Sequence, residues 1–193
     1  MALKFTVADF IKSDKADELK INNTFGVDKG KGYGLSKEHI EENMRHLFKK
    51  CVQPLKSQFP NLAISSGYRC IELNLALKPP GSSTSNHVFG QAVDLYDPTG
   101  EFSSLDIFTW ALYNIPDYHQ MIWEFPEKED FINVGYDFSW VHISYIEGNN
   151  PKTCTMSSEI ELYHELMDEG YPDEMTRRGK YLHGIPEADD TIM

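Results

Sequence analysis

Apolar residues recur at helical spacing through the first third of the chain. Ser36 is a favourable N-cap for a long helix, which we expect Pro54 to kink or end. The apolar positions of this helix are Ile40, Met44, Leu47, Phe48, Val52 and Leu55. Two short helices capped by Thr6 and Ser13 are predicted before it, and the Gly-, Asn- and Lys-rich residues 22–34 predict a loop.

Shorter apolar runs follow in the rest of the chain. The runs at residues 62–64, 92–96, 121–125 and 140–146 predict strands. Helices are predicted over residues 71–77 and from Ser103 or Ser104 through Leu112, and a last amphipathic helix from Ser157 or Ser158. Helices first and strands later predict an α+β fold, with a small antiparallel sheet on which the N-terminal helices pack.

Length and composition support one globular domain with an appendage. The chain has 193 residues, of which 40% are hydrophobic, and this is enough to bury a core. We predict a domain over residues 1–154, followed by an amphipathic helix and an acidic tail over residues 155–193. No apolar run reaches the ~18 residues that a membrane span requires.

The negative charge is concentrated near the C-terminus. The chain carries a formal charge of -12, and residues 155–193 hold ten acidic against three basic side chains. Such a balance argues against nucleic acid and anionic membrane surfaces as partners, because both require basic patches. It also makes the acidic tail a candidate docking segment for a protein partner, such as a virion component.

The cysteines and the N-terminus say little about the compartment. Cys51, Cys70 and Cys154 are widely spaced and odd in number, so we expect reduced thiols. The first residues lack the apolar stretch of a signal peptide. We therefore expect a protein made in the cytoplasm, which would reach a cell wall through lysis or as part of a particle.

The segment from Ser85 to Asp94 contains the most informative chemistry. His87 and Asp94 lie seven residues apart, with Gly90 between them to turn the chain. Imidazole and carboxylate are both zinc ligands, and a catalytic site needs a third ligand with the fourth position open to water. His142, in an otherwise apolar strand pattern, is the best third candidate. The other histidines, His39, His46, His119, His164 and His183, are weaker candidates.

Four ordered motifs resemble one enzyme family. They are Ser65-Ser66-Gly67-Tyr68-Arg69, Glu72-Leu73-Asn74, the Ser-x-His-x-x-Gly-x-Ala-x-Asp segment that begins at Ser85, and Trp140-Val141-His142. Together they resemble the zinc D-Ala-D-Ala carboxypeptidase and L,D-peptidase family, in particular its short phage endolysin-type members. The resemblance covers residues 5–146 and implies a fold shared with the hedgehog signalling domain.

The resemblance also implies roles for individual residues. His87, Asp94 and His142 would bind zinc. Arg69 would stabilise the substrate carbonyl or the oxyanion, although a structural ion pair is the alternative. Ser85 would support the site or bind substrate.

The sequence offers two candidates for the general base. Several family members have an acid three residues before the last histidine, where this chain has Ser139. Phage-type members carry a glutamate at the position of Glu124, and this residue can face the site if its strand pairs with that of His142. Asp137 is the substitute.

The resemblance implies a zinc-dependent peptidase that hydrolyses a peptide bond in peptidoglycan stem peptides. It leaves carboxypeptidase and L,D-endopeptidase activity open. Two other classes compete with this function: a virion structural protein that keeps the peptidase fold without activity, and a hedgehog-like binding module. A phage-encoded, virion-associated peptidase would reconcile the motifs with the acidic tail.

Overall fold

Helices form the N-terminal part of the protein. The computed structural model describes residues 5–25, 35–78, 80–124 and 139–150, together with the backbone of residues 153–157. Helices α1 (Val7–Ile11) and α2 (Asp14–Leu19) begin after Thr6 and Ser13, as predicted. The Ser13 hydroxyl accepts a hydrogen bond from the backbone N–H of Ala16, which satisfies one of the free donors at the start of α2.

The predicted long helix is divided into three segments. Helix α3 (Lys37–Leu47) leads into the wide π-helical turn η1 (Phe48–Val52), and α4 (Gln53–Gln58) continues the chain. Pro54 is the second residue of α4, which continues from η1 in helical backbone, so its missing N–H removes one bond from the helical run. The wide turn lies directly before Pro54, where a proline disturbs a helix. The predicted apolar face is buried along all three segments, apart from Phe48, which is partly buried.

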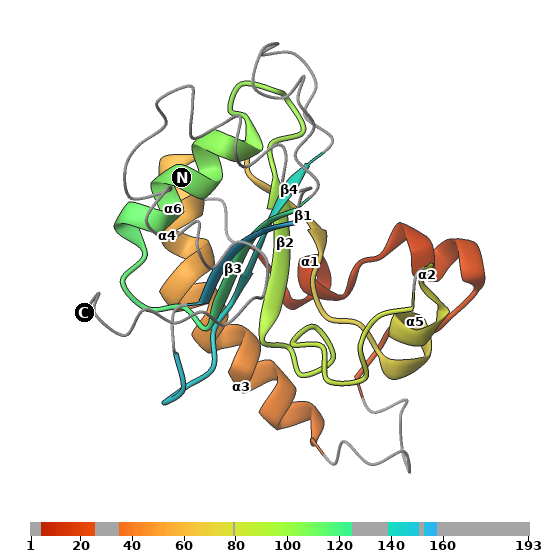
Figure 1. Cartoon of the computed structure of the whole chain (residues 1–193). Coiled ribbons are helices and arrows are strands. Elements are labelled where there is room, and N and C mark those ends of the chain that lie inside the picture. The colour runs from red at the N-terminus through yellow and green to blue at the C-terminus, as the bar shows by residue number, and fades with distance from the viewer. Residues whose placement is uncertain (1–4, 26–34, 79, 125–138, 151–152, 158–193) are drawn as a thin grey trace.

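A five-stranded sheet follows and confirms the α+β class. Its strands are β1 (Ala63–Ser66), β2 (Ala92–Tyr96), β3 (Gln120–Glu124), β4 (Trp140–Ser144) and β5 (Thr153–Ser157), in the order β1-β2-β4-β3-β5. The first four are antiparallel to their neighbours, and β5 runs parallel to β3. Helices α5 (Ile71–Ala76) and α6 (Ser104–Asn114) lie in the connections. Figure 1 shows α4 and α6 to one side of the strands, and α1, α2 and α5 to the other.

Strand β5 differs from the prediction. We expected a helix to begin at Ser157 or Ser158, but Ser157 is the last residue of β5. The division after residue 154 stays a prediction, and β5 runs across it. Residues 158–193, which include the rest of the predicted helix and the acidic tail, lie outside the described residues.

The hydrophobic core fills the sheet face that α3, α4 and α6 cover. Residues on this face alternate along the strands with residues of the opposite face. The core positions of the three central strands are fully buried: Val93, Leu95, Met121, Trp123, Val141 and Ile143. Phe108 of α6 stacks on Trp123, with ring centroids 5.9 Å apart.

Two cysteines belong to this buried interior. Cys51 and Cys70 are free thiols, and burial raises the pKa of Cys51 to about 12, which keeps that thiol protonated and unreactive. The side chain of Cys154 lies outside the described residues. None of the described helices combines the length and the apolar character that a membrane span requires.

Candidate metal centre

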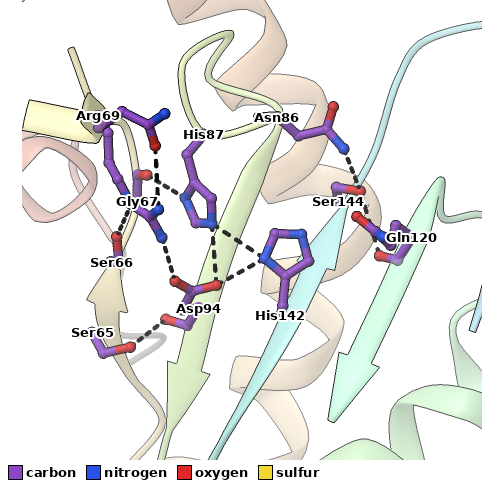
Figure 2. Close-up of polar contacts among 11 residues, drawn as sticks. Ser65, Ser66, Gly67, Arg69, Asn86, His87, Asp94, Gln120, His142 and Ser144 are labelled. Atoms are coloured by element: carbon purple, nitrogen blue, oxygen red, sulfur yellow. Dashed lines mark hydrogen bonds and ion pairs between the residues drawn. The ribbon is translucent and has the colours of Figure 1, made fainter. Parts of the chain in front are cut away.

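Strands β2 and β4 bring two of the predicted ligands together on the sheet face opposite the core. Asp94 pairs directly with His142 in the antiparallel register, and directly paired residues point to the same side. His87 joins them from the turn before β2. All three side chains are buried, and one ligand atom from each lies within 4.8 Å of the others. Figure 2 shows the three side chains converging.

The turn that presents His87 is closed by backbone hydrogen bonds. The carbonyl of Asn86 accepts from the N–H of Gln91 at 2.9 Å and from that of Phe89 at 3.2 Å. Gly90 has a φ of +69°, and an added Cβ would lie 2.8 Å from the side chain of Ile40. The position therefore requires glycine for both reasons, as the sequence predicts.

The hydrogen bonds of His87 determine its tautomer. Its Nδ1 lies 2.7 Å from the carbonyl oxygen of Gly67, which can only accept, so Nδ1 carries the proton. In the neutral ring, Nε2 then has a lone pair, and this atom lies 3.2 Å from both His142 Nδ1 and Asp94 Oδ1. Such fixing of a ligand tautomer by a backbone carbonyl is common in metal sites.

The two carboxylate oxygens of Asp94 have different partners. Oδ1 lies 2.9 Å from Nδ1 of His142, on the side of the two histidines. Oδ2 accepts from Nη2 of Arg69 at 2.9 Å, and Arg69 Nε donates to the hydroxyl of Ser66 at 2.8 Å. Arg69 thus holds Asp94 so that Oδ1 faces the histidines (Figure 2). The structure places Arg69 in the ion pair that the sequence analysis gave as an alternative, and its contact with substrate stays a prediction.

The protonation states favour metal binding. Burial lowers the pKa of His87, and the nearby positive charge of Arg69 acts in the same direction. Burial alone would raise the pKa of Asp94, but the nearby His87 and the hydrogen bond from His142 hold it well below its usual range. A histidine binds a metal as the neutral imidazole and an aspartate as the ionised carboxylate, and the two pKa shifts favour these forms at neutral pH.

The donor set fits a zinc ion. Two imidazole nitrogens and one carboxylate oxygen would leave the fourth tetrahedral position for water. His142 presents Nδ1 to the other two residues, whereas its Nε2 is buried with no hydrogen-bond partner in the described part of the chain. We therefore expect Nε2 of His87, Oδ1 of Asp94 and Nδ1 of His142 to be the ligand atoms.

Glu124 lies on the same sheet face. Strands β3 and β4 pair as the sequence analysis required, with Ile122 opposite His142 and Glu124 two residues further along. Glu124 is half-buried, and burial, together with the charge of Asp94, raises its pKa. The pairing makes a role as general base geometrically reasonable, and the role itself stays a prediction.

Other predicted residues lie around or outside this cluster. Ser85 is half-buried, its N–H donates to the Ser82 carbonyl, and its role with substrate stays a prediction. Ser139 is buried beside Ser104 and Trp123. Asp137, His164 and His183 lie outside the described residues. His39 is exposed on α3, and the half-buried His46 contacts Glu147. His119 bonds to the carbonyl of Asn149 instead of joining the three ligands.

Sequence reasoning gave no role to Ser66 and Gly67. Ser66 accepts from Arg69, and Gly67 offers its carbonyl to His87. An added Cβ on Gly67 would lie 2.3 Å from the carbonyl oxygen of Phe10, so this close approach to α1 requires glycine. Both residues belong to the motif that ends at Arg69, and membership in this motif was the sequence signal that could have indicated their roles.

A comparison with protein families identifies the group to which these motifs belong. The family model described as Peptidase M15 matches residues 4–113, which is more than half of the chain. The chain belongs to the peptidase M15 family. The matched region contains Arg69, His87 and Asp94, and β3 and β4 supply Glu124 and His142 beyond it. No curated protein matches the chain. Membership in the M15 family implies a metallopeptidase with a peptide substrate.

Proposed function

We propose that the protein is a zinc-dependent peptidase that hydrolyses a peptide bond in peptidoglycan stem peptides, as a carboxypeptidase or an L,D-endopeptidase. The observation that supports this most strongly is the buried group of His87, Asp94 and His142 in a member of the M15 family. Each of the three residues lies where the family motifs predict a ligand, and their donor atoms converge on one point.

The side chains have separate tasks in the proposed reaction. A zinc ion held by the three ligands would lower the pKa of a bound water to about 7 and polarise the scissile carbonyl. Glu124 would take the proton of the attacking water and transfer it to the leaving amine. Its raised pKa suits this task, because a general base works best when its pKa approaches the working pH.

Arg69 would contribute a positive charge that is held in a fixed position. Its guanidinium is fixed by Asp94 and Ser66, so it stays in place without reorganisation during the reaction. A fixed positive charge beside the developing oxyanion lowers the energy of the transition state. Ser85, two residues before His87, would support the site by hydrogen bonding or bind substrate next to it.

The finer parts of the proposal concern biological context. A phage-encoded endolysin or a virion-associated enzyme would act on the cell wall, and the acidic residues 155–193 would dock it to a partner. A structural or binding protein of the same fold without activity is the alternative. Catalysis separates these possibilities, because only the enzyme requires a functional general base.

The direct test is a digest of purified peptidoglycan, analysed by liquid chromatography and mass spectrometry. We expect the zinc-loaded protein to release peptides cleaved at one defined bond, and the chelated protein to release none. The His87→Ala variant is the matched control, because it removes one predicted ligand and leaves the rest of the chain unchanged. Zinc bound at one equivalent without cleavage would indicate a binding role. A protein that binds no zinc and cleaves no peptide would refute the proposed function.

A further inference from the structure

Asn74 lies in α5, beneath the turn that presents His87. Its side chain is completely buried, although it carries an amide donor and an amide acceptor. A buried amide needs partners for both ends, because an unmade hydrogen bond in the interior costs ~1–3 kcal/mol. The partners that Asn74 finds belong to two different parts of the metal centre.

The amide group of Asn74 bridges these two parts. Its Nδ2 donates to the carbonyl oxygen of Ser82 at 2.7 Å, and its Oδ1 accepts from Nη1 of Arg69 at the longer distance of 3.5 Å. The carbonyl of Ser82 can only accept and the guanidinium of Arg69 can only donate. The orientation of the amide is therefore fixed, and only a side chain with a donor at one end and an acceptor at the other satisfies both.

Each partner of Asn74 is connected to a different predicted metal ligand. Ser82 begins the turn towards His87: its carbonyl also accepts from the N–H of Ser85 at 3.1 Å. Arg69 leads to Asp94 through the ion pair at 2.9 Å. The backbone N–H of Arg69 also donates to the carbonyl of His87 at 3.2 Å, so the two branches meet again at the ligands.

Gly81 packs the turn directly onto this amide. Its N–H donates to the backbone carbonyl of Asn74 at 2.8 Å. A Cβ added to Gly81 would lie 2.4 Å from Oδ1 and 2.8 Å from Nδ2 of Asn74. The turn and the amide are therefore in close contact, and a change in one displaces the other.

We propose that Asn74 is a positioning residue for the metal centre, which holds the His87 turn and the Arg69–Asp94 pair at a fixed spacing. The inference rests on the proposed zinc site and concerns residues that do not touch the metal. Groups that orient metal ligands change metal affinity by ~10- to 100-fold when they are removed. Asn74 acts on two ligands at once, through Ser82 and through Arg69.

The main test uses Asn74→Asp in the full-length protein. The substitution keeps the shape, but it turns a carboxylate oxygen towards the Ser82 carbonyl and competes with Asp94 for Arg69. We expect the zinc dissociation constant, measured against a chromophoric chelator, to rise ~10- to 100-fold. The visible spectrum of the cobalt(II) form should change, because it reports ligand geometry. In the metal-free protein, amide hydrogen exchange over residues 80–90 should accelerate.

The matched control is Ile107→Val, which removes a buried methylene group in α6 on the opposite side of the sheet. It lowers stability without touching the turn, so its zinc affinity and cobalt spectrum should equal those of the wild type. Gly81→Ala is a second variant in case Asn74→Asp does not fold. It displaces the amide by contact, and we expect a weaker form of the same changes.

Three outcomes would decide the inference. Zinc affinity within twofold of the wild type in both Asn74→Asp and Gly81→Ala would overturn it. The inference would also be overturned if Ile107→Val, at the same stability as Asn74→Asp, lost as much zinc affinity. An equal loss would indicate a purely structural role for Asn74. If the wild type binds no zinc, the proposed function fails instead, and unchanged exchange over residues 80–90 in Asn74→Asp would then overturn the positioning role separately.

Discussion

The two faces of the central sheet are built from the same strands but depend on different interactions. On the face covered by α3, α4 and α6, Val93, Leu95, Val141 and Ile143 are fully buried among other apolar groups. On the opposite face Asp94 and His142, adjacent in sequence to these residues, are almost as buried but polar. Neighbouring residues in β2 and β4 thus belong alternately to the hydrophobic core and to the candidate metal centre.

The difference lies in what compensates for burial. Apolar side chains gain stability in proportion to the area removed from water, so many arrangements of similar volume suffice. A buried carboxylate loses its hydration and needs a specific partner for each oxygen. Asp94 has such partners in His142 at Oδ1 and Arg69 at Oδ2. The apolar face should therefore control stability, and the polar face metal binding and catalysis.

The largest expected effect on the polar face is that of Glu124→Gln. The variant cannot accept a proton, so we expect kcat to fall ~10²- to 10⁴-fold in the peptidoglycan digest. Zinc affinity should be unchanged, because Glu124 is not among the predicted ligands. The folded protein raises the pKa of Glu124, and an ionised carboxylate at pH 7 therefore opposes folding. The variant should accordingly be at least as stable as the wild type at that pH.

Asp137→Asn is the control for this prediction. Asp137 is the substitute base, and its variant should retain wild-type kcat if Glu124 is the base. Unchanged turnover in Glu124→Gln, together with a large loss in Asp137→Asn, would contradict the assignment. A loss of zinc in Glu124→Gln would show instead that the carboxylate helps to hold the ligands.

A substitution of the residue next to Asp94 tests the apolar face. Leu95 is completely buried in the core, and Leu95→Ala would remove most of its side chain and leave a cavity. We expect the free energy of unfolding to fall by ~2–5 kcal/mol, as measured by denaturant titration of the metal-free protein. The zinc dissociation constant of the folded variant should stay within about twofold of the wild type.

The outcome for Leu95→Ala determines whether the two faces are separable. A large rise in the zinc dissociation constant would show that the cavity moves β2 and with it Asp94. Equal zinc binding at much lower stability would confirm that the strand backbone, paired with β1 and β4, holds Asp94 in place independently of the core.

The sequence predicted the parts of the molecule that depend on side-chain patterns. The apolar spacing of Ile40, Met44 and Leu47 predicted the buried face of α3, because helical period and burial are directly linked. His87, Asp94 and His142 could be selected because few residue types bind zinc and because the surrounding motifs resemble one family. The structure brings these three together, as that selection required.

The remaining features depend on backbone contacts that a side-chain pattern does not record. The carbonyls of Gly67 and Ser82 are acceptors at the metal centre, although neither residue type signals this. Strand β5 is an edge strand whose sequence, Thr-Cys-Thr-Met-Ser, does alternate polar and apolar residues. The prediction overlooked this strand signal and began a helix at the serines that end the strand. The wide turn η1 contains Lys50, whose carbonyl the ring of Pro54 would meet in a regular helix, so the proline predicted an irregularity here but not its π-helical form.

The smallest predicted effect concerns the cap of α6, which lies on the apolar face. The Ser103 hydroxyl accepts from the backbone N–H of Asp106 at 3.1 Å, and the Asp106 carboxylate accepts from the backbone N–H of Ser103 at 2.9 Å. Ser103→Ala should lower the free energy of unfolding by ~1 kcal/mol, because it removes this reciprocal cap. Asp106→Ala should cost a similar amount, and the double variant less than the sum, because the two residues share one interaction. Thermal unfolding measures the stability loss, and the zinc dissociation constant should not change in any of the three. A change in zinc affinity here would break the comparison, since it would mean that an end of α6 reaches the metal centre through the whole thickness of the sheet.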